Sequence, residues 1–147
     1  MNVKAILAAK KESLGGDIIS IEPTADLAAA VKCLASHRIG AVLIRGAGGR
    51  LAGILSERDI VRALAKHGPA ALDLPVGQVM TRDVETCGEE ETVARLMERM
   101  TVGKFRHVPV LSNGALIGLI SIGDVVKERV GEIERESDAL RDYIRSA

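Results

Sequence analysis

The residues with the clearest chemical potential form a short pattern that occurs twice. Residues Gly53 to Asp59 read GILSERD, and residues Gly118 to Asp124 read GLISIGD. Each copy has Gly, two aliphatic residues, Ser, two variable residues and Asp, followed by an aliphatic pair. We predict a buried strand that runs into a helix, with the serine at the turn and the aspartate in the first helical turn.

The chemistry available at such a turn is the binding of a ribose phosphate. A helix start carries N–H donors without partners and the positive end of the helix dipole, which together suit a phosphate. An aspartate repels phosphate, but its carboxylate can accept hydrogen bonds from a pair of ribose hydroxyls. Ser-x-x-acid is also a capping box, which satisfies the amides of the helix itself. One copy alone favours the cap, whereas two copies at corresponding points of a duplicated unit favour a binding site.

The composition excludes several other functions. The formal net charge is zero, the sequence pI is about 6.8, and aromatic residues make up 1% of the 147 residues. The chain therefore has neither the basic field nor the stacking platform of a nucleic-acid-binding protein. We find no signal peptide and no long apolar run, and the two cysteines, Cys33 and Cys87, are far apart. We expect a cytoplasmic protein with neither nucleic acid nor membrane as a partner.

Spacings typical of catalysis or metal binding are missing from the sequence. The three histidines and two cysteines are not spaced as metal ligands. The glycines of residues 46–49 (GAGG) precede no predicted helix and predict a hairpin turn instead. We see no P-loop and no paired Ser/His or Cys/His nucleophile. We therefore expect no catalytic residues and no metal site.

The duplication extends well beyond the Ser–Asp pattern. Residues 26–28 match 92–94 and residues 41–44 match 107–110 at an offset of 66, which falls to 65 between Asp59 and Asp124. Each copy is predicted as strand, helix, strand, turn, strand, helix, and Asp26 and Thr92 are predicted helix N-caps. Helices are predicted at 27–36, 60–66, 93–101 and from 125 onward, and inner strands at 41–44, 51–55, 107–111 and 116–120.

With these features the chain resembles a tandem cystathionine-β-synthase (CBS) domain protein, the pair often called a Bateman module. The resemblance rests on the duplicated Ser–Asp pattern, on residues 79–81 (VMT) and on residues 106–110 (RHVPV). It covers roughly Asp17 to Lys127, about three quarters of the chain. It implies an α+β fold of two β-α-β-β-α repeats about a pseudo-twofold axis. The expected segments are 1–16 (N-terminal helix), 17–66 (repeat 1), 67–78 (linker), 79–127 (repeat 2) and 128–147 (C-terminal helix).

The resemblance also implies two clefts for adenine nucleotides and a role for particular residues. Asp59 and Asp124 would hold ribose hydroxyls, with Ser56 and Ser121 near the ribose or phosphate. Two segments would flank the base through their backbones, and a basic pair with Thr81 would contact phosphate. The full set of expected ligand-binding residues is Ile18, Ile19, Ser20, Ser56, Arg58, Asp59, Thr81, Asp83, Val84, Thr86, Arg106, His107, Val108, Pro109, Ser121 and Asp124.

The two copies differ in ways that predict unequal sites. The first copy has Gly40-Ala41 where the second has Arg106-His107, and it has Arg58 where the second has Gly123. Arg58 suits phosphate binding, an ion pair with a neighbouring carboxylate, or plain solvation. We expect one strong nucleotide site and one weak or empty site.

Two flanking helices are predicted outside the repeats. Apolar residues from Val3 to Leu14 form an amphipathic pattern that Gly15-Gly16 would end. The C-terminal segment carries a narrow apolar seam, broken by Ser137, that needs a surface to lie on. That surface is either the same module or a second subunit. Because CBS pairs commonly dimerise, we favour the second subunit and a contact of moderate strength. The seam consists of Val126, Val130, Ile133, Ser137, Leu140 and Ile144.

The sequence thus predicts a regulatory module that senses an adenine nucleotide, acts on an unidentified partner protein and forms a homodimer. AMP is the first choice because one phosphate suits a helix start. ADP, ATP or NAD(H) come next. S-adenosylmethionine is ranked below them because it lacks a phosphate. One alternative is an enzyme, either a nucleotide hydrolase or a fragment of a dehydrogenase. Another is a dimeric scaffold that binds no nucleotide and uses both Ser–Asp pairs only as caps.

Overall fold

The computed structural model describes residues 1–14 and 18–146, and the side chains of residues 11–14 are outside that description. The chain divides into two units, each described here by itself. One comprises Ile18–Glu85, and the other comprises Met1–Asp17 with Thr86–Ala147. The proposed helix stop at Gly15-Gly16 and the proposed repeat start at Asp17 lie outside the described residues.

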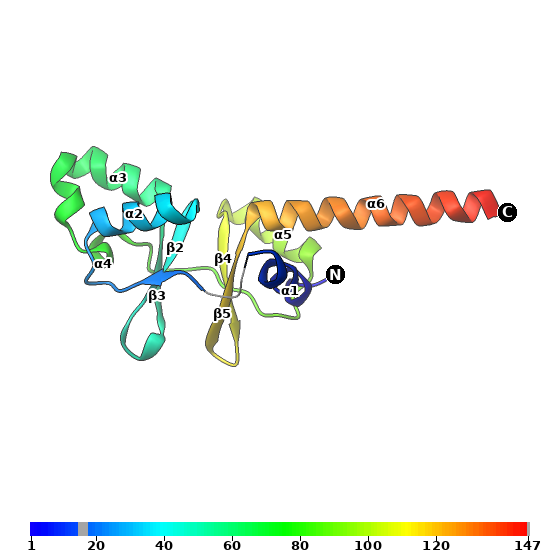
Figure 1. Ribbon diagram of the computed structural model, residues 1–147, viewed down its shortest axis with the longest axis horizontal. Helices are drawn as coiled ribbons and strands as arrows, with labels where there is room; N and C mark the ends of the chain where they lie inside the picture. The colour runs from blue at the N-terminus through cyan, green and yellow to red at the C-terminus, as the bar shows by residue number, and fades with distance from the viewer. Residues whose placement is uncertain (15–17, 147) are drawn as a thin grey trace. The chain divides into compact units, whose positions relative to one another are not determined.

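The unit of residues 18–85 is a three-stranded sheet covered by helices (Figure 1). Strand β1 (Ser20–Ile21) runs parallel to β2 (Ala41–Arg45), which pairs antiparallel with β3 (Leu51–Ser56). Helices α2 (Leu27–His37) and α3 (Glu57–His67) share a core with the strands, formed by residues such as Leu27, Val42 and Leu55. The turn between β2 and β3 holds η1 (Ala47–Gly49), and η2 (Gly68–Asp73) and α4 (Val76–Val79) follow α3.

The other unit has the same plan. Strands β4 (His107–Ser112) and β5 (Ala115–Ser121) form an antiparallel pair. Helices α1 (Val3–Leu14), α5 (Val93–Gly103) and α6 (Ile122–Ser146) accompany them (Figure 1). The core contains Val3 and Ile6 of α1 together with Leu96, Val108 and Ile120. The α+β fold and the paired-repeat plan are therefore confirmed.

Each unit includes a segment that precedes the other repeat in the sequence. Val76 of α4 is buried in the core of residues 18–85, and Met80 packs against that core, although Met80 falls within the segment expected to be the second repeat (79–127). Likewise α1, which precedes the first repeat, packs on the core of the second. The glycine of each Ser–Asp pattern lies at this contact: a Cβ on Gly53 would be 2.6 Å from the Thr81 carbonyl oxygen, and one on Gly118 would be 2.5 Å from Leu7 Cδ2.

The structure differs from the sequence prediction at the first strand of the second repeat. Residues 83–86 form no strand, and the equivalent of β1 is a single parallel bridge between Cys87 and Val110. The Cys87 amide donates to the Pro109 carbonyl, and the Leu111 amide donates to the Cys87 carbonyl. The next bond of the ladder would be donated by the amide of residue 109 to the carbonyl of Glu85. Proline has no N–H, so the ladder stops after one residue.

The other predicted elements are present with shifted ends. Helices predicted to begin at Ile60 and Val125 begin instead at Glu57 and Ile122, so each aspartate lies within the first turn. Both predicted N-caps are confirmed. Asp26 accepts a hydrogen bond from the Ala29 amide and Thr92 accepts one from the Arg95 amide.

Candidate functional site

The first Ser–Asp pair forms a complete capping box at the start of α3. The Asp59 amide donates to Ser56 Oγ at 3.3 Å, and the Ser56 amide donates to Asp59 Oδ2 at 2.9 Å. Ser56 Oγ also lies 3.1 Å from Asp59 Oδ2. The aspartate is 9% exposed and stands alone as the buried charged residue in the described part of the chain. Ser56 and Asp59 therefore cap α3 at this turn, as the capping alternative requires.

The second pair repeats this geometry at the start of α6. The Ser121 amide donates to Asp124 Oδ2 at 2.8 Å, and the Asp124 amide donates to Ser121 Oγ at 3.2 Å. The Gly-aliphatic-aliphatic run before each serine is the end of an edge strand, which delivers the hydroxyl to the same point of both helices. Two equivalent serine–aspartate turns thus exist, and both already serve their own helix.

The aspartates differ in their third partner. Asp59 Oδ1 accepts a hydrogen bond of 3.1 Å from the hydroxyl of Thr81, whose own carbonyl lies against Gly53. Asp124 Oδ2 instead accepts one of 2.9 Å from the ammonium of Lys10 on α1, which also donates to the Leu119 carbonyl at 2.8 Å. A neutral hydroxyl holds one carboxylate, and a cation holds the other.

This difference affects the charge state of the second carboxylate. Burial opposes ionisation of Asp124, but the Ser121 amide and the Lys10 ammonium outweigh it and hold the pKa of Asp124 below its usual value. The side chain of Lys10 is 31% exposed and that of Asp124 is 23% exposed, so the ion pair is only partly desolvated. Asp124 is therefore an anion throughout the neutral range.

The caps leave little of each helix start for a phosphate. The first amide of α3, that of Glu57, donates to the Gly40 carbonyl at 3.0 Å, and that of Ile122 in α6 donates to the Arg106 carbonyl at 2.7 Å. The third amide of each helix is held by its serine. Among the described residues, these contacts leave one first-turn amide in each helix, at Arg58 and at Gly123. A phosphate there needs further donors from side chains.

The backbones of Arg106 and His107 lie beside the second turn. His107 pairs with Ser121 across β4 and β5, and the Arg106 carbonyl binds the first amide of α6. In the first unit the same positions are taken by Ala41, which pairs with Ser56, and by Gly40. The sequence difference between the copies therefore falls directly beside the Ser–Asp turns. Arg106 is exposed and His107 is half-buried.

The remaining predicted residues are spread over both units. In residues 18–85, Ile18, Ile19 and Ser20 are half-buried at the start of β1, and Arg58 and Asp83 are exposed. Val84 and Thr86 are half-buried where the first unit ends and the second resumes. Val108 is fully buried in the core, and Pro109 is buried in β4. These last two side chains support the sheet.

The contact between Lys10 and Asp124 was not predicted from the sequence. Lys10 lies in a helix outside the repeated region, and its partner follows more than a hundred residues later. The only available signal was that Lys10 follows Ile6 by four residues, which places it on the core-facing side of α1.

Among residues 1–14 and 18–146, no group of three or more potential metal ligands comes together. Likewise, none of the helices in that part of the chain has the length and apolar character needed to cross a bilayer.

The comparison with known proteins gives a consistent result. The family model described as CBS domain matches residues 14–66 and 76–131. A mitochondrial CBS domain-containing protein of Arabidopsis thaliana is 38% identical over 119 residues, which are 78% of this chain and 58% of that protein. A 17.7 kDa protein of Acidianus ambivalens is 34% identical over 108 residues, 73% of this chain and 64% of that protein. The chain thus spans less than two thirds of these two curated relatives.

Solved structures match over almost their whole length. A CBS-domain containing protein from Agrobacterium tumefaciens is 45% identical with a TM-score of 0.81, over 87% of this chain and 92% of that one. The CBS domain pair of protein MJ0100, solved with 5'-methylthioadenosine and S-adenosyl-L-methionine, is 26% identical with a TM-score of 0.76. That match covers 90% of this chain and 98% of the other.

Proposed function

Because this chain belongs to the CBS domain family and consists largely of two CBS repeats, we propose that it is a regulatory module that binds an adenine nucleotide and acts on a partner protein. One observation carries the proposal: the same serine–aspartate turn occurs at the start of two equivalent helices. Stand-alone CBS proteins are generally regulatory, and CBS pairs commonly bind adenosine-containing ligands. The MJ0100 pair, solved with two such compounds, supports a ligand of this class.

The ribose is the part of the ligand that the two aspartates suit. A ribose offers two adjacent hydroxyl donors, and a carboxylate accepts both in a bidentate arrangement. Asp59 and Asp124 already accept several protein hydrogen bonds, so a ribose must share an oxygen or displace a partner. Displacing the Thr81 hydroxyl costs less than displacing the Lys10 ammonium, because a charge-assisted bond is stronger. The two turns should therefore bind a nucleotide with different affinities.

AMP is the proposed ligand because the phosphate donors are few. Each helix start offers one remaining amide, and Arg106, whose backbone carbonyl binds the first amide of α6, would add its guanidinium at the second turn. One guanidinium and one amide match a single phosphate. ADP, ATP and NAD(H) are the next candidates. S-adenosyl-L-methionine, which the MJ0100 pair contains, has no phosphate and would leave Arg106 without a role in binding.

The proposed module is not an enzyme, and it works in a reducing compartment, the cytoplasm. Its two cysteines are free thiols, which suits that environment. Nucleotide binding would stabilise one arrangement of the module over another and so change the surface available to a partner protein.

Titration calorimetry of the intact protein with AMP, ADP, ATP, NADH, adenosine and S-adenosyl-L-methionine tests the proposal. We expect AMP to bind most tightly and in two unequal steps. A parallel incubation with radiolabelled AMP and ATP should yield no product. Absence of binding by all six compounds would favour the scaffold alternative, and product formation would favour the enzyme.

A further inference from the structure

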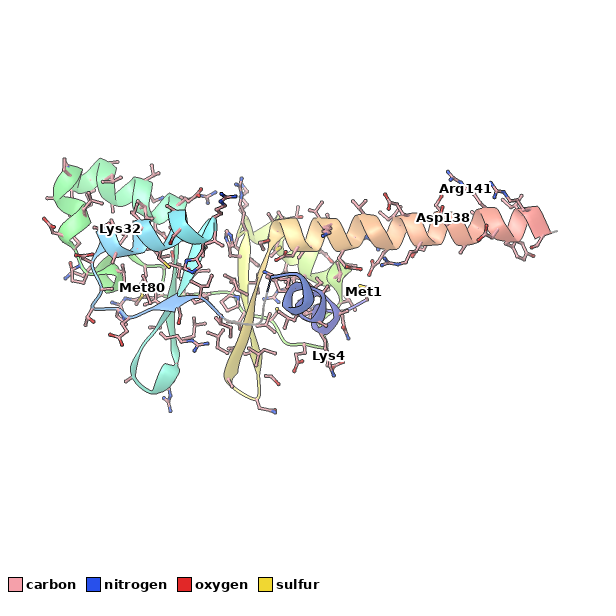
Figure 2. All side chains as sticks on the ribbon, in the orientation of Figure 1. Met1, Lys4, Lys32, Met80, Asp138 and Arg141 are labelled. Atoms are coloured by element: carbon pink, nitrogen blue, oxygen red, sulfur yellow. The ribbon has the colours of Figure 1, made fainter. Side chains whose placement is uncertain are left out.

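Helix α6 continues far past the rest of its unit. Its 25 residues run from Ile122 to Ser146, and beyond α1 and α5 it has no neighbour in that unit (Figure 1). Figure 2 shows Asp138 and Arg141 on this distal part of the helix. An isolated helix with so much exposed length needs a packing partner to be stable in water.

The apolar seam of α6 is uncovered. Its aliphatic side chains are exposed from 40% at Val126 to 64% at Ile144. The inward side of the helix is a different line, defined by the fully buried Val125. At about 100° per residue the centre of the seam lies roughly a quarter turn from Val125, so the unit's own core leaves the seam accessible. Burial of the seam therefore requires a separate partner.

The seam has the spacing of a short coiled coil. Steps of four and three residues place Val130, Ser137 and Ile144 at the a positions of a heptad and Val126, Ile133 and Leu140 at the d positions. The flanking e positions are then Lys127, Glu134 and Arg141, and the flanking g positions include Arg129 and Glu136. Such e and g charges determine the partner and orientation of a coiled coil.

We propose that α6 pairs with α6 of a second copy as a short, parallel, in-register coiled coil. In that arrangement each g residue faces the e residue five positions later on the partner. Arg129 then faces Glu134, and Glu136 faces Arg141, so both kinds of contact are attractive, and each occurs twice by symmetry. The two Ser137 hydroxyls also meet each other at the same layer.

An antiparallel pairing of the same seam brings like charges together. There e residues face e residues and g residues face g residues, so Glu134 meets Glu134 and Glu136 meets Glu136. Lys127 would meet Arg141, and Ser137 would be buried against Ile133. Shifting the antiparallel pair by one heptad removes these like-charge contacts but leaves two aliphatic residues at one end of the seam uncovered. The charges of the fully paired seam therefore favour a second copy of the chain in parallel orientation. One charge of the set, Arg129, also bonds Glu132 within its own helix at 2.9 Å, a contact that a neighbouring helix leaves in place.

Disulfide trapping tests the orientation. In a Cys33→Ser background, Leu140→Cys places the new thiol at a d position, opposite its own copy in the parallel pair. In the antiparallel pair the two thiols are separated by ten residues, about 15 Å along the helix, too far for a disulfide. We expect Leu140→Cys to oxidise to a covalent dimer that is visible on a non-reducing gel. Ala139→Cys, on the same turn but off the seam, should stay largely monomeric on the same gel. Failure of Leu140→Cys to crosslink, or preferential crosslinking of mixed Val130→Cys and Leu140→Cys chains, would overturn the proposal.

Charge reversal tests the partner. Glu136→Arg alone, or Arg141→Glu alone, sets like charges opposite each other twice and should weaken dimerisation by roughly ten-fold in sedimentation at low salt. A mixture of the two variants should recover the wild-type dimer affinity, because in the mixed dimer the residues at positions 136 and 141 again carry opposite charges across the pair. Asp142→Arg makes the same charge change at an f position, away from the seam, and should leave the affinity unchanged. Equal effects of all three variants, or no recovery in the mixture, would show that another surface holds the copies together.

Discussion

Lys10 and Asp124 are 114 positions apart in the chain, yet the Lys10 ammonium lies 2.9 Å from Asp124 Oδ2. The contact joins a helix before the first repeat to the Ser–Asp turn of the second. Its counterpart in the other unit is the bond of 3.1 Å from Thr81 to Asp59. The charge on Lys10 thus distinguishes two turns whose serine–aspartate capping contacts are equivalent.

Replacing Lys10 with methionine should raise the pKa of Asp124 and lower the free energy of unfolding by about 1 kcal/mol at neutral pH. A carboxylate whose pKa is lowered by folding stabilises the native state above its ordinary value of 3.8. That contribution is lost as the pH falls through the lower folded-state pKa. The difference between wild type and Lys10→Met should therefore be full above about pH 5 and shrink towards zero in stronger acid. Denaturant unfolding at a series of pH values measures it. Lys4→Met, at an exposed position of the same helix, is the control, and a constant difference across the whole range would contradict the ion-pair explanation.

Replacing Asp124 with alanine should weaken nucleotide binding by about 1–3 kcal/mol, because the ribose hydroxyls lose a charged acceptor. The variant also loses a cap and the Lys10 ion pair, so its melting temperature should fall too. Thr92→Ala removes a cap elsewhere in the unit, at a cost of about 1 kcal/mol, and should leave affinity unchanged. Calorimetry and thermal unfolding separate the two effects. A lower melting temperature with unchanged nucleotide affinity would assign Asp124 to capping alone.

Replacing Arg106 with alanine should cost more affinity for AMP than for adenosine, by about 1.5 kcal/mol, because only AMP carries the phosphate. Parallel titrations with the two compounds give the comparison. Arg50→Ala, at an exposed turn position between β2 and β3, provides a control for the loss of a positive charge. If adenosine and AMP lose affinity equally, Arg106 orients the turn and does not bind the phosphate.

Replacing Gly53 with alanine should destabilise the protein by about 1–3 kcal/mol. The new Cβ would be 2.6 Å from the Thr81 carbonyl oxygen and 2.7 Å from Met80 Sδ. Because Thr81 holds Asp59, the change should also reduce nucleotide binding at the first turn. Gly88→Ala is the matched control, since nothing lies within 4 Å of its Cβ. Wild-type stability in chemical unfolding of Gly53→Ala would show that residues 80–81 can move aside at little cost.

The sequence by itself determined the duplicated α+β plan and the position of both Ser–Asp turns. These features are local: strand periodicity, the N-cap residues Asp26 and Thr92, and a serine three residues before an aspartate all act within a few residues. The family resemblance then followed from their order and repetition. Even the contact between Arg106 and the second turn follows from register, because one strand pairing places residue 107 opposite residue 121.

Only the tertiary structure decided which segment completes each repeat. Nothing local to α1 indicates that its lysine would reach Asp124, or that residues 76–81 would pack on the repeat before them. The single bridge at Cys87 likewise depends on the missing N–H of Pro109, which lies beyond α5 in the next strand of the chain, β4. Such contacts depend on which surfaces meet after folding. Local propensity carries no information about them, because their free energy comes from burial and charge pairing between distant residues.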